Sequence, residues 1–262
     1  MLVFMEPDIV PDKLEDKINY KIILLIIFVT VSFQGMMFFL QNDDGRNQII
    51  SIVSIINPMI ASISGFIVAK RYGRSMTFGK AHLVLGSGFL CAGIAECIYL
   101  IYDIIWQIEP YPSIADIFFF ALYPFILAYL IISIKFFKPK TSKDELFWMP
   151  IITLAIISTY ITLSFEQLQE ASFDFYYGII FAVLPAIVLP FAILGAKTFR
   201  GGVIGTSWLI LVFAIIALTV GDVWYYYLEI FDEYDLLHPV NVFWYAGYWI
   251  IVYALYKHGK SI

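Results

Sequence analysis

Three acidic side chains lie inside long apolar stretches of the sequence, where an ionised carboxylate is costly. They are Glu96, Asp116 and Asp222, and Asn241 occupies a comparable position near the C-terminus. A carboxylate at the centre of a membrane-spanning helix costs about 2.5–3.5 kcal/mol on the insertion scale, so it persists where protein or water shelters it. Sheltered carboxylates can bind a cation, carry a proton or accept hydrogen bonds from a small polar ligand.

A tyrosine follows each of these four residues after three or seven positions, a spacing that places both on one face of a helix. The predicted polar cluster comprises Glu96, Asp116, Asp222, Asn241, Tyr99, Tyr123, Tyr225 and Tyr248. One interpretation is a binding site for a cation, a proton or a small polar ligand. The other is that these groups hydrogen-bond one another and the backbone, and so hold the helices together. The sequence leaves both interpretations open.

Familiar catalytic motifs are absent from the sequence, which has no Walker loop, no G-x-S-x-G and no H-E-x-x-H. Its three histidines fall near the ends of predicted helices, so the usual haem and zinc ligands are missing from the helix centres. We therefore expect no cofactor, no metal and no catalytic residue. Metal chemistry by carboxylates alone, at Glu96, Asp116 and Asp222, is the enzymatic alternative that stays open.

The elements that must position these residues are membrane helices. Of the 262 residues, 61% are hydrophobic and 14% charged, whereas a soluble domain has roughly 45–50% and 25%. A helix needs about 20 apolar residues to cross a membrane. The predicted spans are 19–40, 47–69, 82–106, 113–136, 146–165, 174–197, 203–229 and 239–257. The prolines inside them predict kinks, because neighbouring groups in a bundle can satisfy the freed carbonyls.

Charge asymmetry predicts the orientation of these eight spans. If the N-terminus is cytoplasmic, every Lys and Arg except Arg46 falls on the inner side. The outer loops then carry the acids Asp43, Asp44, Glu109, Glu166, Glu170, Asp174, Asp232, Glu233 and Asp235. We expect a multi-pass protein of the cell membrane with both termini cytoplasmic and the polar cluster in the outer half. The mixed charges of 1–18 predict a short cytoplasmic segment and no cleavable signal.

The two halves of the chain resemble each other. The segment from Asp116 to Tyr123 aligns without gaps with 241–248, at an offset of 125. Glu96 to Tyr99 aligns with 222–225, and Asp103 with Glu229, at an offset of 126. These matches predict a tandem pair of four-helix halves, 19–136 and 137–262, related by an axis along the membrane normal. The alternative is that aromatic, apolar segments resemble one another by composition alone.

The run from Pro110 to Pro124 reads P-Y-P-S-I-A-D-I-F-F-F-A-L-Y-P. It resembles the P-S-x-A-D…Y-P motif of a multi-span prokaryotic membrane module that often precedes diguanylate cyclase, phosphodiesterase or histidine kinase domains. The resemblance implies that the chain senses a membrane or extracytoplasmic signal. Because the sequence ends at Ile262, soon after the last predicted span, we expect no output domain.

The sequence thus favours an all-α, non-enzymatic, sensor-like membrane module that responds to a ligand or ion through the acidic-tyrosine cluster. A small transporter or channel that uses the same carboxylates as its coupling site is the first alternative. A structural subunit of a membrane complex is the second. The expected partners are the lipid bilayer, a small polar ligand or cation, and a separate signalling or complex partner, with no nucleic acid among them.

Overall fold

The computed structural model describes residues 18–73, 77–108, 111–138, 140–165, 173–202, 204–231 and 233–260. These residues form helices joined by short connections, and none of them is in a β-strand. Residues 1–17 of the predicted N-terminal segment lie outside the described residues, as do the loop residues Arg74, Glu109, Glu166, Glu170 and Asp232. The predicted all-α class is confirmed.

The described residues form eight α-helices and one short π-helix, which follow one another in the sequence. They are α1 (Tyr20–Phe38), α2 (Asp43–Tyr72), α3 (Thr77–Leu100), η1 (Ile101–Trp106), α4 (Ala115–Phe137), α5 (Lys143–Phe165), α6 (Phe173–Thr198), α7 (Gly205–Glu229) and α8 (Asn241–Lys260). Seven of them, α1 to α7, are long and apolar enough to cross a membrane. The protein is therefore a helical, membrane-embedded protein.

Two helices begin four or five residues earlier than the apolar pattern predicts. α2 begins at Asp43 and α3 at Thr77, whereas the predicted spans begin at 47 and 82. At α2, the side chain of Asn42 accepts a hydrogen bond from the backbone N–H of Gly45, and this cap starts the helix among polar residues. An apolar run marks the part of a helix that suits lipid, and the helix itself can continue beyond it. The π-helical continuation of α3 was not predicted.

α8 is not among the seven helices with clear spanning character. Tyrosine, tryptophan and glycine interrupt its apolar residues, which lowers its hydropathy. It packs against α1, α2 and α7, and most of its side chains are buried by protein. A helix with this surrounding exposes little surface to lipid, so its composition carries a weaker membrane signal.

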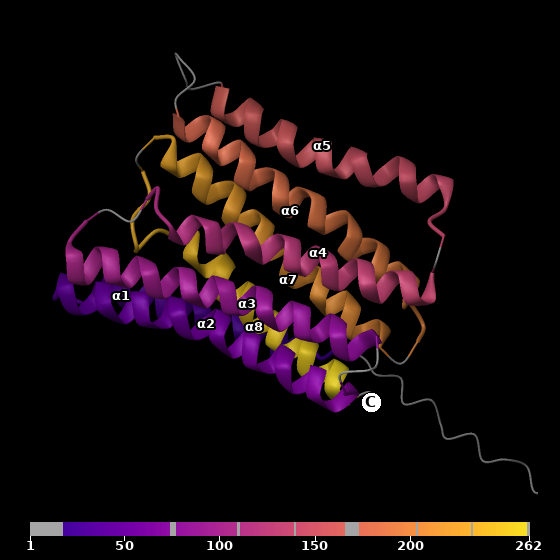
Figure 1. Ribbon diagram of the computed structural model, residues 1–262. Helices are drawn as coiled ribbons and strands as arrows, with labels where there is room; N and C mark the ends of the chain where they lie inside the picture. Colours follow the sequence, from indigo (N-terminus) through magenta and orange to yellow (C-terminus); the bar gives the residue numbers. More distant parts are fainter. Residues whose placement is uncertain are drawn as a thin grey trace, which may run out of the picture.

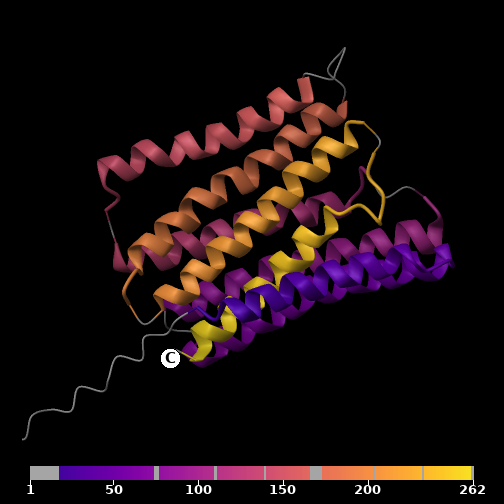
Figure 2. The ribbon, with the colours of Figure 1, turned by 180° about the vertical axis from the view of Figure 1, so that it is seen from behind.

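Six helices form a closed ring in which each contacts the next. The order around the ring is α2, α3, α4, α6, α7, α8 and back to α2. α1 packs outside the ring on α8, and α5 packs outside it mainly on α6. Figures 1 and 2 show the result from two sides, an elongated bundle with α5 along one edge and α1 and α2 along the other.

The ring is packed as one body. A continuous buried cluster contains residues of both predicted halves, from Ala61 on α2 to Leu255 on α8. α2 and α3 approach closely, because the Ser62 hydroxyl donates to the Gly86 carbonyl at 2.8 Å. A Cβ atom on Gly65 would lie only 3.0 Å from the Gly86 Cα, and one on Gly86 would lie 2.8 Å from the Phe66 ring, so glycine at both positions favours this close approach.

A proline in α6 shows how the bundle satisfies the backbone groups that prolines free. Pro190 has no N–H to bond the carbonyl of Ala186, four residues earlier in the helix. The hydroxyl of Thr153 on α5 donates to that carbonyl at 2.9 Å. This bond joins the outlying helix α5 to the ring at a point where α6 has a spare acceptor.

One end of the bundle is fastened by charged side chains. Glu145, at the start of α5, is buried and forms an ion pair with Lys138 and another with Lys197 at 3.3 Å. Glu145 also accepts from the backbone N–H of Ser142 at 2.9 Å, while the Ser142 hydroxyl accepts from the Glu145 N–H, which is a capping box. This end holds the α4–α5 and α6–α7 connections and the C-terminus (Figure 1).

Candidate functional site

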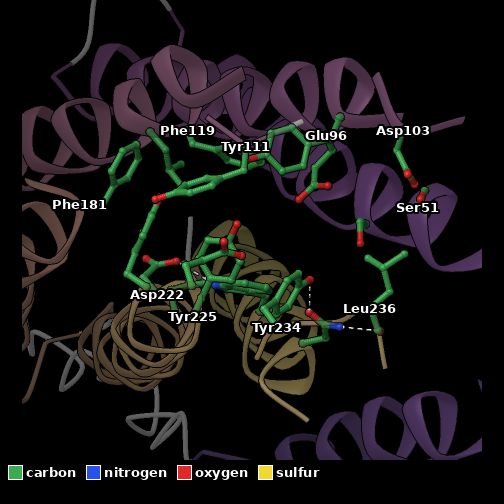
Figure 3. Close-up of a pocket in the computed structure, with 18 of the residues that line it drawn as sticks. Ser51, Glu96, Asp103, Tyr111, Phe119, Phe181, Asp222, Tyr225, Tyr234 and Leu236 are labelled. Atoms are coloured by element: carbon green, nitrogen blue, oxygen red, sulfur yellow. Dashed lines mark hydrogen bonds between the residues drawn. The ribbon is translucent and has the colours of Figure 1, made fainter. Parts of the chain in front are cut away.

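A cavity of about 300 Å³ lies inside the ring, at the end opposite the C-terminus. All six ring helices contribute to its wall, and α1 and α5 do not. It is lined by Ser51, Ser54, Glu96, Tyr99, Leu100, Asp103, Tyr111, Phe119, Leu122, Tyr123, Phe181, Leu218, Asp222, Tyr225, Tyr226, Glu229, Tyr234, Asp235, Leu236, Asn241, Trp244 and Tyr248. Figure 3 shows Glu96 on one wall, with Asp222 and Tyr225 on the facing wall.

Seven of the eight residues of the predicted polar cluster line this cavity. They are Glu96, Tyr99, Tyr123, Asp222, Tyr225, Asn241 and Tyr248. Asp103 and Glu229, which the internal alignment pairs with each other, line it as well. The structure thus brings these residues together from α3, η1, α4, α7 and α8. Whether they bind a ligand stays a prediction.

Asp116 is the predicted residue that does not line the cavity. Its carboxylate accepts from the backbone N–H of Ser113 at 2.6 Å, and the Ser113 hydroxyl accepts from the N–H of Ala115 at 3.2 Å. This resembles a capping box at the start of α4, except that the Ser113 hydroxyl accepts from the residue before Asp116. The Tyr99 hydroxyl donates a further bond to Asp116 at 3.2 Å, so the carboxylate is almost wholly buried and well supplied with donors.

Asn241 lines the cavity and also anchors the connection between α7 and α8. Its amide donates to the Leu236 carbonyl at 2.8 Å and its oxygen accepts from the Tyr234 hydroxyl at 3.1 Å. Gln34 on α1 donates to the same Leu236 carbonyl at 3.1 Å. Burial raises the pKa of Tyr234 well above its ordinary value, so its hydroxyl stays a donor. These bonds hold the 233–240 connection beside the cavity.

Only one of the two carboxylate oxygens of Asp222 has a hydrogen-bond partner among the described residues. Trp244 on α8 donates from its indole Nε1 to Asp222 Oδ1 at 2.8 Å. The other oxygen, Oδ2, is buried and has no hydrogen-bond partner among the described residues. A Cβ atom on Gly221 would lie 2.8 Å from the indole nitrogen, so glycine at that position lets the ring reach the carboxylate.

The cavity is acidic. Five carboxylate residues line it, and its described lining includes no Lys, Arg or His; the acids are Glu96, Asp103, Asp222, Glu229 and Asp235. Asp103 and Asp235 are exposed, Glu96 and Asp222 are half-buried, and Tyr123 and Tyr248 are buried, so the acids extend from the mouth inward. Negative charge concentrated in a cleft with apolar walls raises the local concentration of cations.

Aromatic rings form most of the remaining wall. Seven tyrosines, two phenylalanines and Trp244 line the cavity. Several rings meet edge to face, among them Tyr225 with Tyr234 at a centroid distance of 4.8 Å and Tyr99 with Phe119 at 5.3 Å. Such contacts fix the orientation of the rings. The wall is therefore built from rigid side chains.

The described residues contain no group of three or more His, Cys, Asp and Glu side chains that could hold a metal ion. Glu96 and Asp222 line the cavity on facing walls, whereas Asp116 lies outside it, so the three acids named for carboxylate-only metal chemistry do not all line the cavity.

Sequence reasoning did not identify several lining residues. Tyr111, Tyr234, Asp235 and Leu236 lie in connections, where no helical spacing signals a shared face. Trp244 could have been found, because the alignment at offset 125 places it opposite Phe119, which also lines the cavity. Ser51 and Ser54 carry no signal beyond their place on α2.

Comparisons of this chain with protein-family models, curated proteins and solved structures found no match. Its own structure defines its class as a membrane-embedded helical bundle with an acidic, aromatic cavity.

Proposed function

We propose that the protein is a non-enzymatic, sensor-like membrane module that binds a small polar or cationic ligand in this cavity. The observation that carries the proposal is the convergence of seven predicted polar residues from different helices on one cavity of about 300 Å³. This volume lies at the lower end of the range of roughly 300–1,000 Å³ found for ligand pockets. Because all six ring helices contribute to the cavity wall, a bound ligand can change how they pack.

The proposed topology has eight spans, both termini in the cytoplasm and the cavity on the outer side of the cell membrane. The distribution of charge supports it. The described Lys and Arg residues other than Arg46 lie at helix ends away from the cavity; they are Lys21, Lys70, Arg71, Lys80, Lys135, Lys138, Lys140, Lys143, Lys197, Arg200, Lys257 and Lys260. Positive residues are retained on the cytoplasmic side. α8 spans the membrane in this proposal as the most sheltered helix.

The proposed tandem repeat is supported by the order of the ring. The contacts of α2 with α3 and of α3 with α4 recur as contacts of α6 with α7 and of α7 with α8. The closing contacts also correspond, since α4 packs on α6 as α8 packs on α2. The outer helices depart from the relation, because α1 packs on α8 and α5 packs on α6.

A sensor is favoured over a transporter by what lies beneath the cavity. Large side chains fill the centre of the ring there, among them Phe89, Tyr129 and Trp208, all with 2% exposure or less. The next hollow described in the ring has a volume of only about 10 Å³. These buried side chains lie between the cavity and the inner end of the bundle, so the proposed signal passes through helix packing to a separate partner.

A small transporter is the second candidate, and one observation favours it. Buried His82 and His258 lie in the ring below the cavity with ring centroids 4.6 Å apart, and Tyr72 forms a 2.8 Å hydrogen bond with His258. Polar groups within a membrane bundle often mark transport routes. Flux measurements in proteoliposomes separate the two, because a sensor carries no ligand across the bilayer.

The proposal is tested with the purified full chain in lipid nanodiscs and a library of neutral, anionic and cationic small molecules. Thermal melting is compared between the natural protein and the Glu96→Gln/Asp222→Asn double variant. Asp44→Asn is the matched control, because Asp44 is exposed and lies outside the cavity. We expect some compounds to raise the melting temperature of the natural protein and the control, and not that of the double variant. If no compound in the library has this effect, the proposal is wrong.

A further inference from the structure

The chemistry of the cavity wall specifies the class of ligand more narrowly. A neutral polar ligand needs donors and acceptors of both kinds, and an anion needs basic groups or backbone N–H groups. The described lining offers five carboxylates and no basic side chain. Desolvating this many negative groups is unfavourable unless a positive charge enters with the ligand. The wall is therefore matched to a cation.

The aromatic part of the wall favours an organic cation over an inorganic one. Ca²⁺ takes about 6–8 oxygen ligands and Mg²⁺ demands octahedral oxygens, whereas the described acids here form no cluster suited to a metal ion. Aromatic rings attract organic ammonium groups through the negative faces of their π systems. Ten aromatic side chains stand beside the acids in this lining. Carbon chains also gain from contact with such rings, which a hydrated metal ion does not.

Asp222 distinguishes between kinds of ammonium. Its Oδ1 is fixed by Trp244, and its Oδ2 is buried without a partner, so it requires a donor. Among the described residues, the buried hydroxyl of Tyr111, which also lines the cavity, has no hydrogen-bond partner either. A primary ammonium group offers three N–H donors, whereas a quaternary ammonium offers none. The Asp222 oxygen thus points to a ligand with N–H groups, and the Tyr111 hydroxyl, which can accept as well as donate, is compatible with one.

We propose that the cavity binds a small organic molecule carrying a primary ammonium group, held between the carboxylates of Glu96 and Asp222 and enclosed by aromatic rings. Figure 3 shows these two acids on facing walls. The inference rests on the proposed function, in that it requires the cavity to be a ligand site. A cavity of about 300 Å³ has room for a ligand of a few carbon atoms together with water.

The test uses the full chain in nanodiscs and four defined compounds. They are n-butylammonium, its neutral analogue butan-1-ol, tetramethylammonium and Ca²⁺. Binding is followed by calorimetry and by the fluorescence of Trp244, with Trp244→Phe identifying its share of the signal. We expect n-butylammonium to bind, tetramethylammonium to bind at least tenfold more weakly, and butan-1-ol and Ca²⁺ to leave the protein unchanged.

The variant Asp222→Asn removes the charge while keeping an oxygen that can accept from Trp244. We expect it to weaken n-butylammonium binding about tenfold or more, as hydrogen bonds to charged groups are strong. Asp44→Asn, the same change at an exposed residue outside the cavity, should bind as the natural protein does. Glu96→Gln on the facing wall is the second variant, and it decides the question if Asp222→Asn fails to fold.

Each outcome separates the ligand class from the proposed function. Equal binding of n-butylammonium to the natural protein, Asp222→Asn and Glu96→Gln overturns the organic-ammonium proposal. Stabilisation by Ca²⁺, or by only neutral or anionic members of the wider library, overturns it too but leaves a ligand-responsive cavity in place. Failure of every compound, the library included, overturns both.

Discussion

Trp244 donates its indole N–H to Oδ1 of Asp222 at 2.8 Å, and this bond joins α7 to α8 at the wall of the cavity. The bond fixes the plane of the carboxylate and leaves Oδ2 without a partner. A purely structural role would be complete if both oxygens were satisfied, as they are in Asp116. The half-satisfied carboxylate is therefore the feature that separates a binding site from a helix contact.

Removing the indole donor tests how much the fixed orientation of the Asp222 carboxylate contributes to ligand affinity. Trp244→Phe keeps an aromatic ring but loses the N–H, so Asp222 is no longer fixed. A hydrogen bond to a charged group contributes about 1.5–3 kcal/mol, and about 1.4 kcal/mol is tenfold in affinity. We expect n-butylammonium to bind roughly tenfold more weakly by calorimetry. Trp249→Phe is the control, because Trp249 donates to Asn57 away from the cavity. Equal losses in both variants would contradict the assignment.

Gly221 offers a second way to disturb the same bond without touching either partner. A methyl group there would lie within 3 Å of two atoms of the Trp244 indole, so Gly221→Ala must move the ring from Asp222. We expect a lower melting temperature and weaker n-butylammonium binding. Gly35→Ala is the matched control, because no atom lies within 4 Å of a Cβ at Gly35. Alanine has the better helix propensity, so this variant should be as stable as the natural protein or slightly more stable. Unchanged binding in Gly221→Ala would show that the indole contact is dispensable.

Asp116 should behave differently from Asp222. As a cap whose oxygens are already bonded, Asp116 supports the start of α4, and Asp116→Ala should cost about 0.5–2 kcal/mol of stability. n-Butylammonium affinity should change little, because Asp116 does not line the cavity. Thermal melting and calorimetry on the same preparation give both quantities. A loss of n-butylammonium binding with unchanged stability would show that Asp116 belongs to the binding site.

The sequence predicted the helical class and seven residues of the cavity wall because both follow from periodicity. Acids and tyrosines three to seven residues apart had to share a helix face, and lipid excluded the acids from the outside of the bundle. Asp116 has the same residue type, but its role depended on Ser113, three residues earlier. The identical spacing of Ser142 and Glu145 forms the other capping box, so the S-x-x-D/E pattern was the overlooked signal.

Other features depended on contacts that no local pattern encodes. The 233–240 connection beside the cavity is held by Gln34, some 200 residues away in sequence. The closed ring likewise arises from the contact of α2 with α8. Aligned halves predicted similar pairings, but they could not indicate that α1 and α5 would pack on different partners, since both helices are apolar on all sides.

Thr153 tests how α5 is attached to the ring. Thr153→Val removes the hydroxyl that donates to the Ala186 carbonyl, which Pro190 leaves without its helical partner. Interhelical hydrogen bonds in membranes contribute about 0.6 kcal/mol on average and up to about 1.7, and an orphaned carbonyl favours the upper value. We expect a lower melting temperature. Thr159→Val, which loses only a bond within its own helix, should melt close to the natural protein. Equal melting of both variants would show that water or lipid satisfies Ala186 as well.

The place of α8 in the membrane is open to a direct labelling experiment. Single cysteines replace Asp44, Lys143, Glu233 and Lys260 in turn, with the half-buried Cys91 and Cys97 changed to Ala. If α8 spans the bilayer and the cavity faces outward, an impermeant maleimide labels the cysteines at 44 and 233 in intact cells. It should label those at 143 and 260 only after permeabilisation.

Labelling of the cysteine at 260 decides whether α8 spans the membrane. Of the eight described α-helices, α8 alone is not among those with clear spanning character, yet its side chains are mostly covered by α1, α2 and α7. Protein cover removes the need for lipid-compatible surface, so a spanning α8 does not require high hydropathy. Labelling at 260 from the same side as 233 would mean that α8 re-enters the side on which it begins. The protein would then have seven spans, and the proposed cytoplasmic position of the C-terminus would be wrong.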